Sequence, residues 1–150
     1  LRPESTGTLS LRSASMHDHP VIRPNYLATQ TDCDTIVRGI QIARGLCDYE
    51  PIKSLVTEEY APGKNIGRDD TDAILNWARD TATTIYHPTG TCKMGHDKMA
   101  VVDERLRVRG IQGLRVADAS IMPVITSGNT NAPAIMIGEK ASDLIMEDAA

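Results

Sequence analysis

The scarcity of aromatic residues limits how this chain can build a core. Its 150 residues include no phenylalanine, one tryptophan and four tyrosines, although 41% of the residues are hydrophobic. A chain of this length can bury a sizeable core and normally forms one compact domain. We therefore expect a core that is packed mainly by isoleucine, valine, leucine, alanine and methionine.

Charge, hydropathy and cysteine content exclude several classes of protein. The net charge of -4 offers no cluster of lysine and arginine for nucleic acid. The sequence has no run of roughly 20 apolar residues that could cross a bilayer. Cys33, Cys47 and Cys92 are odd in number and scattered, which argues against a disulfide framework and favours a reducing compartment. We expect a cytoplasmic protein, associated with a membrane only through a longer parent.

Helical spacing of apolar residues predicts three helices. The first begins near Thr31, whose hydroxyl would cap it, and leaves Arg38 and Arg44 off its apolar face. The second begins at the acidic run 69–72 and ends before Pro88. The third begins at 131–133 and continues to about residue 145. The residues expected on the three buried faces are Ile36, Val37, Ile40, Ala43 and Leu46; Ile74, Leu75, Trp77 and Ala78; and Ile135, Ile137, Ala141, Leu144 and Ile145.

Period-2 alternation predicts short strands between these helices. Residues 6–12 alternate polar and apolar side chains, and residues 21–27 form a second extended segment that is interrupted by Pro24. Residues 101–117 are expected to form two strands around a turn. Because helices and strands do not alternate regularly, the pattern favours an α+β fold.

Three stretches hold candidate functional residues. His87, in a turn fixed by Pro88, could exchange a proton near neutral pH, although a lone histidine is more often structural. Asp118 follows an apolar strand and precedes two small residues, where backbone N–H groups could approach a ligand; it could equally cap the strand end. Residues 127–133 hold two asparagines at a helix start, which suits either negative charge or ordinary capping.

Metal and nucleophile sites have weaker support. His17 and His19 are metal-ligand types without a second pair at ligand spacing, so a solvated loop is the better interpretation. His87, Cys92 and His96 lack an obvious fourth ligand, and Cys92 has only His87 as a possible base. No metal is predicted, and neither G-x-S-x-G nor a glycine-rich phosphate loop occurs.

Taken together and in order, these stretches resemble the C-terminal region of the glucose-methanol-choline (GMC) oxidoreductases. The resemblance rests on Y-H-P-T-G-T-C-K-M-G (86–95), on residues 101–123 and on residues 127–145, which open with S-G-N-T-N-A-P. It is most like the choline dehydrogenase branch. It extends to the opening residues 1–13 and to P-N-Y-L (24–27), whereas about 48–80 is unspecific.

The resemblance implies an FAD-dependent enzyme that oxidises a CH–OH group of a small alcohol. It implies that 1–85 belongs to a substrate-binding domain, and that 86–150 supplies the active-site loop with the closing strand and last helix of an FAD-binding domain. His87 and Asn129 would be catalytic. The positions that would touch FAD are Asp118, Ala119, Asn131, Ala132 and Pro133.

The chain starts at Leu1 rather than at methionine, and the G-x-G-x-x-G loop of this family is missing. We therefore expect a fragment that needs an absent N-terminal FAD-binding region and is inactive alone. Faces that would meet that region favour self-association into a homo-oligomer. Two alternatives stay open: an oxidase that uses oxygen, and a non-catalytic binding or assembly module.

Overall fold

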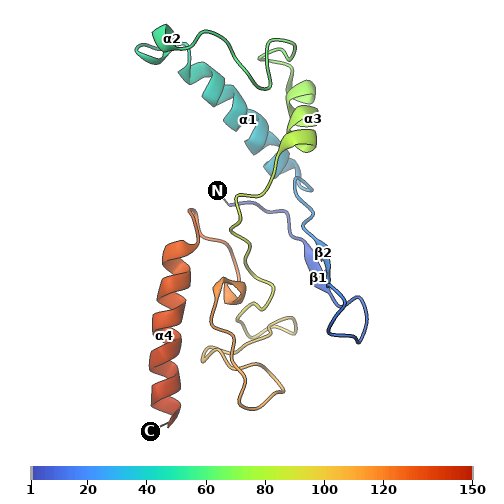
Figure 1. Ribbon diagram of the computed structural model, residues 1–150, viewed down its shortest axis with the longest axis vertical. Coiled ribbons are helices and arrows are strands. Elements are labelled where there is room, and N and C mark those ends of the chain that lie inside the picture. The colour runs from blue at the N-terminus through green and yellow to red at the C-terminus, as the bar shows by residue number, and fades with distance from the viewer. Residues whose placement is uncertain (1, 150) are drawn as a thin grey trace. The chain divides into compact units, whose positions relative to one another are not determined.

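The computed structural model describes residues 2–149, and these divide into two compact units (Figure 1). The helix-pair unit comprises residues 3–8 and 22–83. The C-terminal unit comprises residues 2, 9–21 and 84–149. The model mixes helices with a small sheet, which confirms the coarse fold class, and no helix within residues 2–149 is long and apolar enough to cross a membrane.

The two-stranded sheet is formed by β1 (Thr8–Ser10) and β2 (Val21–Arg23), both shorter than the predicted segments. Pro24 ends β2 because proline has no N–H to donate to a partner strand. Gly7 precedes β1 at a close approach of two backbones. A Cβ at this position would lie 2.6 Å from the Pro24 carbonyl oxygen and closer still to that of Arg23, so only glycine fits.

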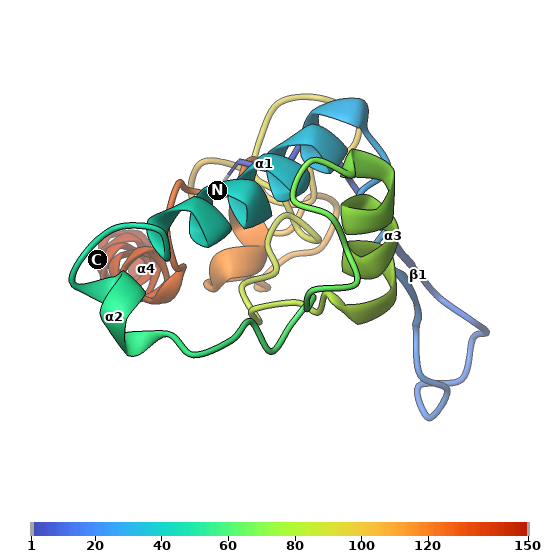
Figure 2. The same ribbon diagram turned by 90° about the horizontal axis from the view of Figure 1, so that it is seen from above.

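The helix-pair unit is built from α1 (Gln30–Leu46) and α3 (Thr71–Thr81), which pack against each other (Figures 1 and 2), and the single turn α2 (Ile52–Leu55). The predicted cap of α1 is wrong by two residues. Thr29, not Thr31, caps the helix, and its hydroxyl accepts a hydrogen bond from the Asp32 amide at 3.3 Å. Asp70 caps α3 by accepting from the Ala73 amide at 3.0 Å, as the acidic run predicted.

The buried face of α1 also differs from the prediction. Cys33 and Val37 are buried, but Leu46 is 55% exposed and Ala43 is exposed. Arg44, which was predicted to lie off this face, is 7% exposed. Its burial follows from partners that lie far along the chain, because its guanidinium binds the segment 59–67 rather than water.

Each of the three guanidinium nitrogens of Arg44 has an acceptor. Its Nε and Nη2 donate to the two carboxylate oxygens of Glu59, at 2.6 and 3.0 Å. Nη2 also reaches the carbonyl oxygens of Gly63 and Ile66, at 3.4 and 3.1 Å, and Nη1 donates to that of Gly67 at 3.3 Å. One side chain therefore ties an otherwise irregular loop to α1.

Asp32 makes the stability of the helix-pair unit dependent on pH. Its carboxylate accepts from the amides of Glu4 and Ser5, at 3.0 and 2.8 Å. Hydrogen bonds from the Ser5 side chain and the Glu4 amide lower the pKa of Asp32 below its usual 3.8. A lowered folded-state pKa stabilises the fold fully above the unfolded-state pKa, and this stabilisation is lost as the pH falls through the folded-state value.

We expect Asp32→Asn to lower the free energy of unfolding at pH 7, and we expect the difference from the parent chain to shrink as the pH falls through the lowered folded-state pKa of Asp32. At low pH the aspartate of the parent chain is itself protonated, so the two proteins become alike at this position. Urea unfolding of both chains between pH 7 and pH 2 measures the difference. A difference that stays constant across this range would contradict the role of the carboxylate.

The C-terminal unit packs around α4 (Asn131–Ala149) and the short 3₁₀ helix η1 (Ala119–Ile121), which contact each other. The core contains only aliphatic residues and methionine, as the composition predicts. Its members are Val102, Leu106, Ile121, Met122, Ile137, Ala141 and Leu144. Ile135 and Ile145 were predicted to join them but are 61% and 50% exposed, because α4 buries only one face.

Residues 101–117 do not form the two predicted strands. They make single bridges between Val102 and Val108 and between Arg107 and Arg115. Leu106, Gly110 and Gly113 adopt left-handed φ values of 64°, 80° and 73°. These conformations turn the chain too often for a continuous ladder.

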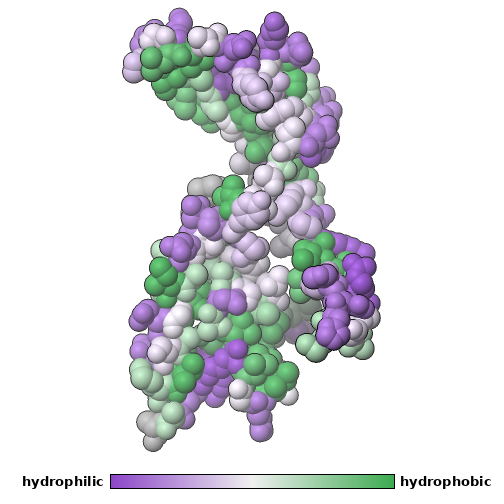
Figure 3. Space-filling model, in the orientation of Figure 1, coloured by the Kyte–Doolittle hydropathy of each residue, from purple (hydrophilic) through white to green (hydrophobic). Residues whose placement is uncertain are grey.

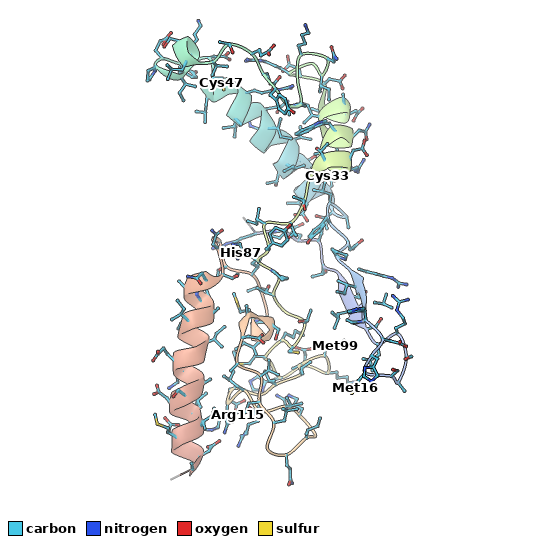
Figure 4. All side chains as sticks on the ribbon, viewed as in Figure 1. Met16, Cys33, Cys47, His87, Met99 and Arg115 are labelled. Carbon is cyan, nitrogen blue, oxygen red and sulfur yellow. The ribbon has the colours of Figure 1, made fainter. Side chains whose placement is uncertain are left out.

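Ion pairs hold this segment against the end of α4. Arg105 donates to Glu147 and Asp148 at 3.1 and 2.7 Å, and Arg115 also pairs with Asp148. Figure 4 shows Arg115 beside the C-terminal half of the helix. Arg105 and Arg115 therefore anchor this segment to the helix, which explains part of the pattern that resembled a strand.

Candidate active site

His87 lies in an irregular loop and points to the start of α4 (Figure 4). The preceding Tyr86 has a left-handed φ of 63°, and Pro88 follows the histidine. The Nδ1 atom of the half-buried His87 is 2.9 Å from the Thr130 hydroxyl oxygen. The backbone N–H of Thr130 also donates to Nδ1, at 3.3 Å. The two segments, 43 residues apart in sequence, thus meet through one ring nitrogen.

Thr130 immediately precedes α4, and its carbonyl oxygen accepts the first hydrogen bond of the helix, from the Ala134 amide at 2.9 Å. It is 6% exposed. Its hydroxyl is next to His87 and does not cap the helix, so the N–H groups of Asn131 and Ala132 have no hydrogen-bond acceptor within residues 2–149. Pro133 has no N–H to satisfy. The helix therefore begins with two unpaired donors at its positive end.

Asn129 lies near His87 because it directly precedes Thr130 in the sequence. Its side chain is exposed and forms no hydrogen bond with the part of the chain that the structure describes. The structure joins His87 to Thr130 rather than directly to Asn129. A contact between the imidazole and the Asn129 amide stays a prediction.

Asp118 and Ala119 lie at the start of η1. The exposed Asp118 carboxylate accepts from the Ser120 amide at 2.8 Å, and hydrogen bonds from the Ser120 side chain and backbone lower the pKa of Asp118. It caps a 3₁₀ turn and not a strand end, because no strand forms before it. The Asp118 carboxylate is therefore charged at neutral pH.

The loop that carries His87 continues along η1. The amides of Cys92 and Met94 donate to the carbonyl oxygens of Ser120 and Ile121, at 2.9 and 2.7 Å. η1 in turn contacts α4. Three of the segments singled out in the sequence therefore form one connected structure around the start of α4.

Other polar features of the described chain do not form a competing site. A surface hollow lined by Asp103 and residues 107–115 contains none of the candidate residues. Arg107 pairs there with Asp103 at 2.9 Å, and Arg109 donates to the Gly95 carbonyl oxygen. Within residues 2–149, no three histidine, cysteine, aspartate or glutamate side chains lie close enough together to hold a metal ion.

The residue in contact with His87 that the sequence did not single out is Thr130. It stands between two asparagines at a helix start, where threonine is an ordinary capping residue. The local sequence does not distinguish a threonine that caps a helix from one that contacts a distant imidazole. Only the fold shows that its hydroxyl and amide both face His87.

Comparison with known proteins identifies the family. Residues 3–138 match the family model described as GMC oxidoreductase. The chain belongs to the GMC oxidoreductase family. It is 46% identical over 146 residues to the alcohol dehydrogenase [acceptor] of Pseudomonas putida, and 47% identical over 148 residues to the mitochondrial choline dehydrogenase of Homo sapiens. These alignments cover 97% of this chain, and 26% and 24% of the two relatives.

The fold is shared with a solved oxidase. A formate oxidase of Aspergillus oryzae, studied for modification of its FAD, superposes with a TM-score of 0.85 at 32% identity, over 95% of this chain and 25% of the oxidase. The chain thus spans about a quarter of the length of these relatives. GMC oxidoreductases use FAD, which agrees with the cofactor expected from the sequence.

Proposed function

We propose that this chain is the C-terminal part of an FAD-dependent alcohol dehydrogenase of the choline-dehydrogenase type, which oxidises a CH–OH group to an aldehyde or ketone. The observation that carries the proposal is the pairing of His87 with Thr130 at a helix start where two N–H donors have no acceptor among residues 2–149. In this proposal residues 1–85 belong to the substrate-binding domain. Residues 86–150 provide the active-site loop and complete the FAD-binding domain.

His87 and Asn129 would act on the alcohol oxygen. Oxidation removes the hydroxyl proton and leaves alkoxide-like charge on that oxygen. An imidazole and a carboxamide within hydrogen-bond reach can receive the proton or hold the charge. The amide of Asn129, one residue before the partner of His87, is exposed and has no partner in the described part of the chain, which suits such a task.

The start of α4 fits the charge of reduced FAD. When bound, FAD supplies the acceptor for the hydride that leaves the alcohol carbon. The N–H groups of Asn131 and Ala132, aligned with the helix dipole, would stabilise negative charge placed against them. Pro133 completes this turn without adding a donor that needs a partner.

Asp118 and Ala119 would hold another part of the cofactor. A charged carboxylate accepts hydrogen bonds and repels phosphate, so Asp118 suits hydroxyl groups such as those of a ribityl chain. The Ala119 N–H has no acceptor among the described residues and suits a phosphate oxygen. Asp118 would thus bind hydroxyl groups of the cofactor, and the adjacent Ala119 would bind a phosphate oxygen.

The test is to purify a full-length protein that contains these residues and to add primary alcohols, choline included, in the absence of oxygen. We expect a yellow protein whose flavin absorbance is bleached by a substrate alcohol. A colourless full-length protein would contradict the proposal and favour a binding or assembly module. Rapid oxygen consumption during turnover would identify the alternative, an alcohol oxidase.

The 150-residue chain alone is expected to be colourless, inactive and self-associating. The residues of α4 that would meet the rest of the protein expose apolar side chains, among them Met136 at 59% and Met146 at 63%, and Figure 3 shows apolar residues at the surface of both units. Contiguous exposed apolar surface favours association. Light scattering that gives a monomer at high concentration would contradict the last expectation.

A further inference from the structure

The contact between His87 and Thr130 contains one donor that cannot reverse its role. A threonine hydroxyl can either donate or accept a hydrogen bond, because its hydrogen rotates. A backbone N–H can only donate. The Thr130 N–H points at Nδ1 of His87, and Thr130 is 6% exposed, so water is poorly placed to replace the imidazole as its acceptor.

We propose that Thr130 is a positioning residue that fixes neutral His87 in the tautomer with its proton on Nε2. In this tautomer Nδ1 carries a lone pair that accepts from the Thr130 amide, 3.3 Å away, and from the hydroxyl, 2.9 Å away. In the other tautomer Nδ1–H would donate to the hydroxyl but would face the amide hydrogen, leaving a buried N–H unpaired.

The tautomer determines what His87 can do, and this step rests on the proposed function. Neutral His87 presents an Nε2–H donor to any group on the far side of the ring. Protonation of Nδ1 would displace the hydrogen bond from the Thr130 N–H, whereas the Thr130 hydroxyl can rotate to accept. In its resting state His87 therefore contacts the alcohol oxygen as a hydrogen-bond donor through Nε2.

The experiment is long-range ¹H–¹⁵N correlation NMR of a ¹⁵N-labelled full-length protein that contains these residues, at about pH 8, above the ordinary histidine pKa of about 6.5. Comparison with His87→Gln assigns the His87 ring. We expect an unprotonated Nδ1, a protonated Nε2 and a measurable coupling across the hydrogen bond from the Thr130 amide nitrogen to Nδ1. The exposed His17, His19 and His96 serve as internal references.

Two variants separate positioning from packing. Thr130→Ser keeps the amide and the hydroxyl and should keep the His87 spectrum. Thr130→Val keeps the amide alone, so Nδ1 should stay unprotonated while its resonance shifts with the loss of the hydroxyl contact. If Thr130→Val loses helix content by circular dichroism, the wild-type and Thr130→Ser spectra decide the question.

A protonated Nδ1 in the wild-type chain or in a folded Thr130→Val would overturn the proposal. These spectra require neither FAD nor alcohol. A full-length protein without alcohol oxidation would therefore defeat the proposed function while leaving the tautomer assignment intact. A contrary tautomer would defeat the assignment while leaving the activity to be measured.

Discussion

Replacing Arg44 with methionine should lower the free energy of unfolding of the chain by about 3 kcal/mol, roughly a hundredfold in the unfolding constant, because it breaks a buried ion pair by removing one partner. Methionine fills the volume but supplies no donor. Glu59 and the carbonyl oxygens of Gly63, Ile66 and Gly67 would all lose their partner. Urea unfolding measures the change.

The matched control is Arg38→Met on the same helix. Arg38 is exposed and makes no hydrogen bond or ion pair with residues 2–149, so the same substitution there should change stability little. Arg44→Lys should fall between the two, because an ammonium cannot reproduce the paired geometry of a guanidinium. Equal stability of Arg44→Met and Arg38→Met would contradict the role of the buried guanidinium.

A second readout localises the effect. The segment 56–67 has no long helix or strand of its own, and Arg44 ties it to α1. Loss of this tie should expose Lys64 to trypsin in Arg44→Met well before the chain unfolds globally. Cleavage at Lys64 that is as slow as in Arg38→Met would show that the loop is held by other contacts.

Sequence periodicity predicts helices well here because each helix has its own local signal. α3 and α4 begin at the predicted acidic and proline-containing starts, and α4 buries Ile137, Ala141 and Leu144 at helical spacing. The same reasoning misplaces Arg44, since its charge argues for solvent. Its acceptors lie 15–23 residues away in a segment without periodicity, and only the fold brings them to the helix.

Alternation of residue types is a weaker guide in the segment 101–117. Leu106 and Val108 alternate with arginines as they would in a strand. The arginines are placed instead by partners, because Arg105 and Arg115 reach the acidic end of α4. The left-handed backbone at Leu106 interrupts the ladder. A leucine gives no indication of a left-handed conformation, so the sequence does not predict the turn at Leu106.

The candidate site is predictable as a set of segments but not as a set of contacts. The motifs around His87 and Asn129 are recognisable as sequence, and the structure connects their segments. The residue that makes the contact is Thr130, whose two possible uses look alike in the sequence. The sequence motifs therefore identify which segments form the site, whereas the partner of each hydrogen bond is known only from the structure.

Replacing His87 with alanine in the full-length protein should lower the turnover of alcohol by about 10²-fold or more, because the alcohol oxygen loses the group that stabilises its developing charge. Asn129→Ala should lower turnover by a similar order of magnitude. Stopped-flow bleaching of the flavin by alcohol, in the absence of oxygen, measures the chemical step without the later acceptor.

His96→Ala provides the matched control for this measurement. His96 is exposed, lies nine residues after His87 in the same irregular segment, and has no partner among the described side chains. The FAD content of each variant separates loss of cofactor from loss of chemistry: His87→Ala should keep its flavin, because the donors assigned to FAD are backbone N–H groups of Asn131 and Ala132. A flavin-loaded His87→Ala that reduces as fast as His96→Ala would remove the imidazole from the reaction.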